Sequence, residues 1–200
     1  AAITEALSCV YNGISQCHIR PGDAVVVIGA GPIGMMHAML AKMSGAGKVF
    51  VSDIAQNRLE ACKDIDPSFI PVGADVAEVV EKMTGGHGAD VVITACPVPS
   101  AQQNALKMAA NYGRICFFGG LPADRQEVPL NSNLIHYKQL IVTGSTRASL
   151  KQFKESLGFV TDGILDVKKL ITRHFPLSEI QQGFEYAKAA NGLKNIIDMD

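Results

Sequence analysis

The feature that most constrains the fold is a run of branched apolar residues that leads into three glycines. Residues 24–28 read AVVVI, which is typical of a strand buried on both faces of a parallel sheet. Gly29, Gly31 and Gly34 follow in the pattern G-x-G-x-x-G, and apolar residues then recur at helical spacing up to residue 43. Glycine turns are common, but one placed between a strand and a helix predicts a dinucleotide-binding unit.

Each residue of this turn has a predicted task. Gly29 permits the tight turn, Gly31 leaves room for a pyrophosphate, and Gly34 lets the helix pack closely on the strand. Pro32 lacks an N–H group at a position where the helix would leave it unpaired. The free N–H groups of the helix start, with their partial positive charge, would then attract the phosphates. A turn with a purely structural role is the remaining interpretation.

An acidic residue closes the next strand, as dinucleotide binding requires. Residues 48–52 (KVFVS) predict that strand, and Asp53 follows it. A carboxylate there accepts hydrogen bonds from a ribose 2′-hydroxyl and repels a 2′-phosphate, which predicts NAD rather than NADP. Arg58 is placed to cover the adenine or the ribose. Asp53 is also suited to capping the following helix and Arg58 to facing solvent, and Asp53 can do both.

The rest of the chain alternates between strand and helix patterns. This alternation predicts an α/β fold, a doubly wound six-stranded parallel sheet in the order 3-2-1-4-5-6, followed by a β-α-β extension. We expect an NAD-binding domain over 1–164 and a separate segment over 165–200. Cap patterns predict helix starts at Asp75, Ser100, Ser149 and Ser178. Further strands are expected at 69–72, 90–95, 114–118 and 139–143, with an irregular connection over 121–138.

Composition excludes several classes of partner. The formal net charge is −1, so nothing favours nucleic acid or an anionic membrane surface. The apolar runs are too short to span a bilayer, and no signal peptide is visible. The five cysteines include no C-x-x-C pair, which predicts neither a disulfide framework nor a zinc knuckle. We expect a reducing, cytoplasmic location.

The residues alone reveal no catalytic centre. No tyrosine is followed four residues later by lysine, so the chain lacks the Y-x-x-x-K pair of short-chain dehydrogenases. No histidine lies at metal-ligand spacing from another histidine or a carboxylate. His37 is interpreted as a satisfied or exposed helix residue and His87 as solvated, and Cys96 and Cys116 as small core residues. A non-catalytic NAD-sensing module therefore stays open.

Several motifs, taken together, resemble the zinc-dependent medium-chain dehydrogenases, and among them the sorbitol (L-iditol 2-) dehydrogenase-like polyol branch. These motifs are RPGDAVVVIGAGPIGMMHAMLAK, Asp53 with Arg58, GADVVITA, GRICFFGGLP, NLIHYKQLIVTGS and KLITRHFPLSEI. The resemblance implies that a catalytic domain precedes this chain and supplies a Cys, a His and a Glu to one zinc. It also implies that residues 165–200 return to that domain.

The resemblance assigns roles to individual residues. It implies that Glu5 faces the catalytic zinc, as a ligand or through its bound water, and that Arg147 contacts substrate. On the residues alone, Glu5 is an exposed helix acid and Arg147 a surface charge. Two positions depart from the family: Ala6 replaces a common proline, and Ala148 replaces a polyol-binding tyrosine. The implied cofactor contacts are Ile33, Asp53, Arg58, Phe118, Gly119, Gly120, Ser145 and Thr146.

The expected function is hydride transfer from a polyol or secondary alcohol to NAD, with zinc held mainly by the preceding domain. The isolated chain should bind NAD without dehydrogenase activity. The alternatives are the NAD-sensing module and a zinc-free member similar to quinone reductases. The sixth strand, over 139–143, should lie at the sheet edge and pair with a copy of itself in a homodimer or homotetramer.

Overall fold

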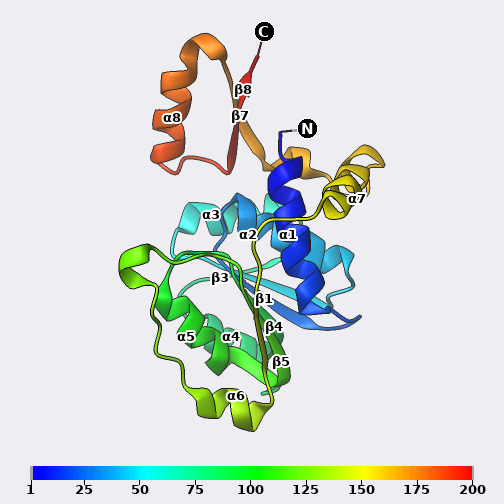
Figure 1. Ribbon diagram of the computed structural model, residues 1–200, viewed down its shortest axis with the longest axis vertical. Coiled ribbons are helices and arrows are strands. Elements are labelled where there is room, and N and C mark those ends of the chain that lie inside the picture. Colours follow the sequence, from blue (N-terminus) through cyan, green and yellow to red (C-terminus); the bar gives the residue numbers. More distant parts are fainter. Residues whose placement is uncertain (1, 200) are drawn as a thin grey trace.

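The computed structural model describes residues 2–199 and confirms the predicted sheet. Six parallel strands lie in the order β3-β2-β1-β4-β5-β6 (Figure 1). The strands are β1 (Ala24–Ile28), β2 (Lys48–Ser52), β3 (Ile70–Val72), β4 (Ala89–Thr94), β5 (Ala109–Phe117) and β6 (Ile141–Gly144). The order reverses between β1 and β4, so the crevice at the carboxyl ends of these strands is where such a fold binds nucleotides.

Alternate residues of β1 enter two separate cores. Val25 and Val27 face one hydrophobic cluster, and Ala24 and Val26 face the other. Both faces of the strand are therefore buried, which explains its unbroken apolar run. The register places Val26 opposite Phe50 of β2 and Val92 of β4, so the sheet centre is apolar on both sides.

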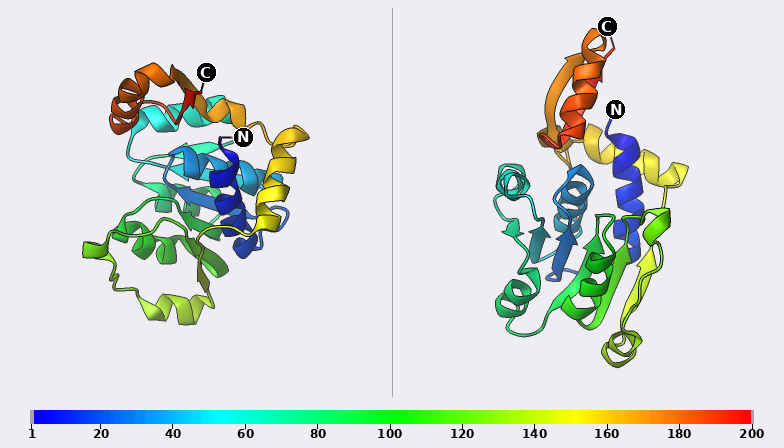
Figure 2. Two further views of the ribbon diagram at one scale, coloured as in Figure 1. Left: turned by 45° about the horizontal axis from the view of Figure 1, so that its top comes forward. Right: turned by 90° about the vertical axis from the view of Figure 1, so that its left-hand side faces the viewer.

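Helices cover both faces of the sheet (Figure 2). α1, α2 and α3 contribute side chains to one cluster, and α4, α5 and α6 to the other. α7 packs along α1. The helices are α1 (Thr4–Cys17), α2 (Pro32–Met43), α3 (Gln56–Ile65), α4 (Val76–Met83), α5 (Pro99–Met108), α6 (Ser132–Lys138) and α7 (Leu150–Thr161).

The region expected to be an irregular connection, 121–138, contains more order than predicted. It holds a short 3₁₀ turn, Ala123–Arg125, and the helix α6. The Asn131 side chain accepts a hydrogen bond from the Asn133 N–H group and so caps α6. β5 also begins earlier than expected, directly after α5, and its register with β4 shifts between Ala89 and Val91.

Two of the four predicted helix starts are confirmed, at Ser149 and Asp75, and only at Ser149 does the side chain form the cap. Ser149 and Gln152 form a reciprocal capping box at the start of α7. α5 begins at Pro99, so Ser100 lies inside the helix instead of at its cap. Ser178 lies within a 3₁₀ turn before α8, and Asp75 occupies the cap position of α4 without a side-chain hydrogen bond.

The last part of the chain forms the predicted β-α-β unit. β7 (Ile171–Pro176) and β8 (Lys194–Asp198) pair in parallel as a separate two-stranded sheet, and α8 (Ile180–Lys188) connects them. In Figure 1 this unit stands apart from the main sheet. Within residues 2–199, no helix combines the length and the apolar character needed to cross a bilayer.

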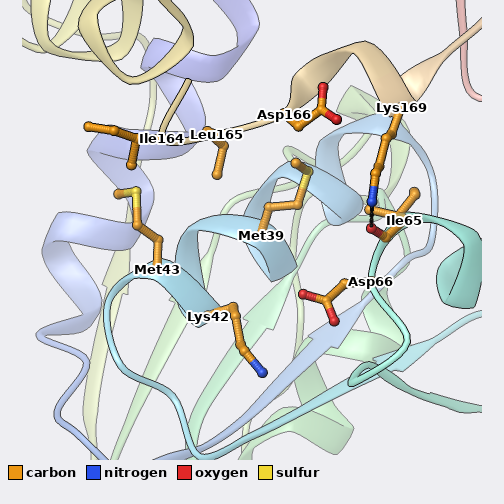
Figure 3. Close-up of a pocket in the computed structure, with 9 residues that line it drawn as sticks. All are labelled: Met39, Lys42, Met43, Ile65, Asp66, Ile164, Leu165, Asp166 and Lys169. Atoms are coloured by element: carbon orange, nitrogen blue, oxygen red, sulfur yellow. Dashed lines mark hydrogen bonds between the residues drawn. The ribbon is translucent and has the colours of Figure 1, made fainter. Parts of the chain in front are cut away.

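The segment that leads to this unit is anchored on the main core. Leu165, Val167 and Leu170 are buried in the same cluster as α1 and α2. Beside them lies a cavity of about 260 Å³ at the ends of α2 and α3 (Figure 3). Lys169 Nζ donates to the Ile65 carbonyl oxygen across it at 2.9 Å. This cavity lies at the joint between the main sheet and the β-α-β unit. The domain boundary between 164 and 165 remains a prediction.

Candidate cofactor cleft

The glycine turn has the geometry that a phosphate cradle needs. Gly29 adopts φ +112°, which favours glycine, and its N–H group donates to the Ser52 carbonyl oxygen at 2.7 Å. A Cβ atom on Gly34 would collide with the carbonyl oxygen of Gly29, so only glycine allows this close approach. Gly31 precedes α2 and Pro32 is its first residue. The N–H groups of the first turn of a helix have no partner within it, and such groups attract anions such as phosphate.

Asp53 connects this turn to the start of α3. Its Oδ2 atom accepts a hydrogen bond from the Ala30 N–H group at 2.8 Å, and Oδ1 accepts from Ala55 at 2.9 Å. Arg58 Nη1 lies 3.5 Å from Oδ2. Asp53 thus holds the turn before α3 but does not cap the helix itself, because the cap residue is Ala55. The structure places Asp53, Arg58 and the glycine turn together.

Gly29, Asp53 and Arg58 border an open cavity of about 430 Å³ at the carboxyl edge of the sheet. Sequence reasoning missed several of its lining residues. Ile54, directly after Asp53, is 96% exposed although it is large and apolar. Cys96, expected in the core, is half-buried and lines the cavity instead. Its full lining is Ile28, Gly29, Ser52, Asp53, Ile54, Arg58, Ala74, Val76, Cys96, Val98, Ser100, Ala101, Asn104 and Met108.

Residues 118–120 leave the sheet at the carboxyl end of β5. The N–H groups of Phe118 and Gly119 both donate to the Thr94 carbonyl oxygen of β4, at 3.2 and 2.7 Å. A Cβ atom on Gly119 would lie 2.6 Å from the Cys96 carbonyl oxygen, so glycine is required there. The Phe118 ring packs edge-on against His37 of α2, with centroids 4.5 Å apart. This segment is therefore fixed at the carboxyl ends of β4 and β5 and against α2.

Residues 145–147 leave the sheet at the carboxyl end of β6. Arg147 adopts φ +59°, a left-handed conformation that is unfavourable for a residue with a Cβ atom. The Asn12 side-chain amide donates to the carbonyl oxygens of Thr146 and Arg147, at 3.5 and 3.1 Å. α1 thereby holds the turn that presents Arg147.

Glu5 lies on the exposed side of the first turn of α1. The Cys9 thiol donates to its Oε1 atom at 3.4 Å. Its neighbours Ile3 and Ala6 line a small apolar cavity together with Pro32 and Ile33 of α2. The structure therefore puts Glu5 near the start of α2. Among residues 2–199, no three histidine, cysteine or carboxylate side chains gather as a metal site.

His37 differs from its predicted setting, and His87 agrees with its own. His37 is fully buried, and neither ring nitrogen has a hydrogen-bond partner. Burial lowers the pKa of His37 to about 3, so the ring is neutral and serves as a packing group for Phe118. His87 is exposed, as predicted, and its Nε2 atom also lies 2.9 Å from Asp90 Oδ1. Cys116 is buried, as predicted.

Known proteins match nearly the whole chain. Sorbitol dehydrogenase of Halalkalibacterium halodurans is 30% identical over 98% of this chain and 58% of its own length. D-xylulose reductase A of Aspergillus oryzae is 30% identical over 98% of this chain and 56% of its own. The solved structure of an alcohol dehydrogenase from Thermus sp. ATN1 superposes with a TM-score of 0.87 at 29% identity, covering 98% of this chain and 57% of that one.

The chain thus spans a little more than half the length of these relatives. A family model described as zinc-binding dehydrogenase matches residues 32–162, which include Asp53 and the ends of β5 and β6. The predicted resemblance is confirmed: the chain belongs to the zinc-binding dehydrogenase family.

Proposed function

We propose that this chain is the NAD-binding portion of an enzyme that transfers hydride from a polyol or secondary alcohol to NAD. The observation that carries the proposal is the Asp53 carboxylate, held beside the glycine turn at the edge of a 430 Å³ cavity. This is where the ribose of a dinucleotide lies in a doubly wound fold. The names of the relatives supply the substrate class.

The charge of the cavity favours NAD over NADP. The Asp53 side chain is 8% exposed and anchored by two backbone N–H groups, so it cannot turn away from a 2′-phosphate. Two like charges about 4 Å apart near a protein surface repel by roughly 4 kcal/mol before screening. Arg58, which is 3.5 Å from the carboxylate, offsets part of this repulsion. A ribose 2′-hydroxyl instead donates a hydrogen bond to the carboxylate.

The remaining predicted residues surround the other half of the cofactor. Residues 118–120 and 145–147 follow β5 and β6, on the far side of the crevice from Asp53. They would exclude water from the nicotinamide and fix the face that it presents to substrate. Arg147 would contact the polyol hydroxyls. Ala148, where the family has a polyol-binding tyrosine, would offer the polyol no hydrogen-bonding group.

A zinc ion would lower the pKa of the substrate hydroxyl when bound. The described residues fit such an ion only in part, because Glu5 has the Cys9 thiol beside it but no third ligand among residues 2–199. Glu5 would face the ion, and the other ligands would come from a preceding domain. The β-α-β unit, with its exposed Phe184 and Ile180, would pack against that domain.

β6 would join two copies of the enzyme. It lies at the sheet edge, and Ile141 is 56% exposed on it. An edge strand of this kind can pair with a copy of itself across a two-fold axis. Sedimentation of the enzyme should give a dimer or tetramer, and a monomer would contradict this part of the proposal.

The experiment that tests the function compares the isolated chain with the chain extended by its preceding coding sequence. Formation of NADH is followed with sorbitol or xylitol, before and after zinc is removed by a chelator. The extended protein should oxidise a polyol only with zinc, and the isolated chain should bind NAD without turnover. Polyol oxidation by the isolated chain would contradict the proposal, as would activity of the extended protein that survives complete zinc removal.

A further inference from the structure

The side chain of Asn12 joins two elements that are far apart in the sequence. Its Nδ2 atom donates to the carbonyl oxygens of Thr146 and Arg147. Its Oδ1 atom accepts a hydrogen bond from Gln152 Nε2 at 2.9 Å. Gln152 is itself held by the capping box with Ser149, at the start of α7. One amide therefore ties α1 both to the turn after β6 and to the helix that follows it.

The hydrogen bonds from Asn12 hold a strained backbone conformation at Arg147. Arg147 is in the left-handed region at φ +59°, which costs about 1 kcal/mol or more for a residue with a Cβ atom. Such a conformation persists only where neighbouring groups enforce it. Asn12 supplies that enforcement by donating to the carbonyl oxygens of the two peptide units that flank the Arg147 Cα atom.

The next residue of α1 supports the second segment. Gly13 is buried, and a Cβ atom on it would lie 2.9 Å from Phe118 Cδ2 and 3.1 Å from His37 Cε1. The absence of a side chain lets the Phe118 ring lie directly on α1, with His37 against its edge. Phe118 in turn begins the segment that runs over the end of β5.

Both segments lie on the same side of the cofactor crevice. Asp53 anchors the adenosine half at β2, and a dinucleotide crosses the sheet edge between β1 and β4. Its other half therefore falls over the ends of β4, β5 and β6, where Phe118 and residues 145–147 emerge. We propose that Asn12 and Gly13 are positioning residues for the nicotinamide half of the cofactor, acting through Arg147 and Phe118. This inference rests on the proposed NAD-binding function.

The test compares binding of the whole dinucleotide with binding of a ligand that lacks the nicotinamide. The affinity of the chain for NADH is measured from the fluorescence of the reduced nicotinamide, and its affinity for ADP-ribose by calorimetry. The variants are Asn12→Leu, which removes all three hydrogen bonds, and Asn12→Asp, which keeps only the acceptor for Gln152. Gly13→Ala displaces Phe118 independently of Asn12. Gln16→Ala, on the exposed side of the same helix, is the matched control, and melting temperatures verify folding.

The Asn12 and Gly13 variants should bind NADH about tenfold more weakly, equivalent to ~1.4 kcal/mol, and should lose much of the nicotinamide fluorescence enhancement. Their affinity for ADP-ribose should stay within about twofold of the parent chain. The inference is overturned if both Asn12 variants bind NADH normally, or if ADP-ribose binding falls equally. A parent chain that binds neither ligand would overturn the proposed function as well, and the two failures are thereby distinguished.

Discussion

Replacing Gly31 by alanine should separate cofactor binding from folding. Gly31 has φ −73° and ψ 179°, which alanine adopts readily, and the nearest atom to an added Cβ is Arg58 Nη1 at 3.9 Å. A Gly→Ala change at a compatible conformation stabilises a protein by about 0.4–1 kcal/mol, because the unfolded chain loses freedom. We therefore expect Gly31→Ala to melt about 1–3 °C above the parent chain.

The same substitution, Gly31→Ala, should weaken the binding of NAD. The new methyl group would occupy the space through which the pyrophosphate approaches the helix start. Forcing a methyl group into a fitted contact costs about 1–3 kcal/mol, which corresponds to a loss of NAD affinity of roughly fivefold to 150-fold. Differential scanning calorimetry and isothermal titration measure the two effects on the same sample.

Gly34→Ala provides the contrast within the same turn. Its Cβ atom would collide with the backbone carbonyl oxygen of Gly29, which cannot move without displacing β1 or α2. We expect a loss of about 1–3 kcal/mol or more in the free energy of unfolding, seen as a melting temperature lower by about 3–10 °C. The reasoning is refuted if Gly31→Ala binds NAD as the parent chain does, or if Gly34→Ala is as stable as Gly31→Ala.

Three further outcomes test other parts of the structure. Arg147→Gly should be about 1 kcal/mol more stable to urea than Arg147→Ala, because glycine relieves the left-handed backbone; equal stabilities would contradict the strain. NAD should slow the alkylation of Cys96 but not that of Cys9, because of these two thiols only Cys96 lines the cavity. Peptide mass spectrometry measures both rates. The labelling is done at alkaline pH because burial raises the pKa of both thiols. Burial lowers the pKa of His37 from 6.5 to about 3. The free energy of unfolding that depends on the neutral ring is therefore complete above pH 6.5 and is lost as the pH falls toward 3. His37→Leu should flatten the dependence of the free energy of unfolding on pH in this range, and an unchanged slope would contradict the assignment.

The sequence predicted those parts of the molecule that depend on local patterns. The strand of residues 24–28, the glycine turn and Asp53 were predictable because each task depends on residues close in the chain. The strand order followed from the alternation of strands and helices. Ser149 was a correct cap because its partner Gln152 lies only three residues away.

The features that the sequence did not predict depend on contacts between residues far apart in the chain. Cys96 was expected in the core, but β4 ends at Thr94, so Cys96 lies beyond the strand and lines the cavity. The contacts of Asn12 lie more than 130 positions away, and no pattern around it reveals them. Pro99 at the first position starts α5 one residue before Ser100, so Ser100 cannot be its cap. α6 was missed because it is only seven residues long.

The most direct test of the account is a calorimetric titration of the chain with NAD and with NADP, repeated on Asp53→Asn. The parent chain should bind NAD at least about tenfold more tightly than NADP, a difference of ~1.4 kcal/mol. Asp53→Asn, which removes the charge but keeps the shape, should narrow that difference. Equal or tighter binding of NADP by the parent chain would contradict the role assigned to Asp53, and no binding of either dinucleotide would contradict the cofactor cleft itself.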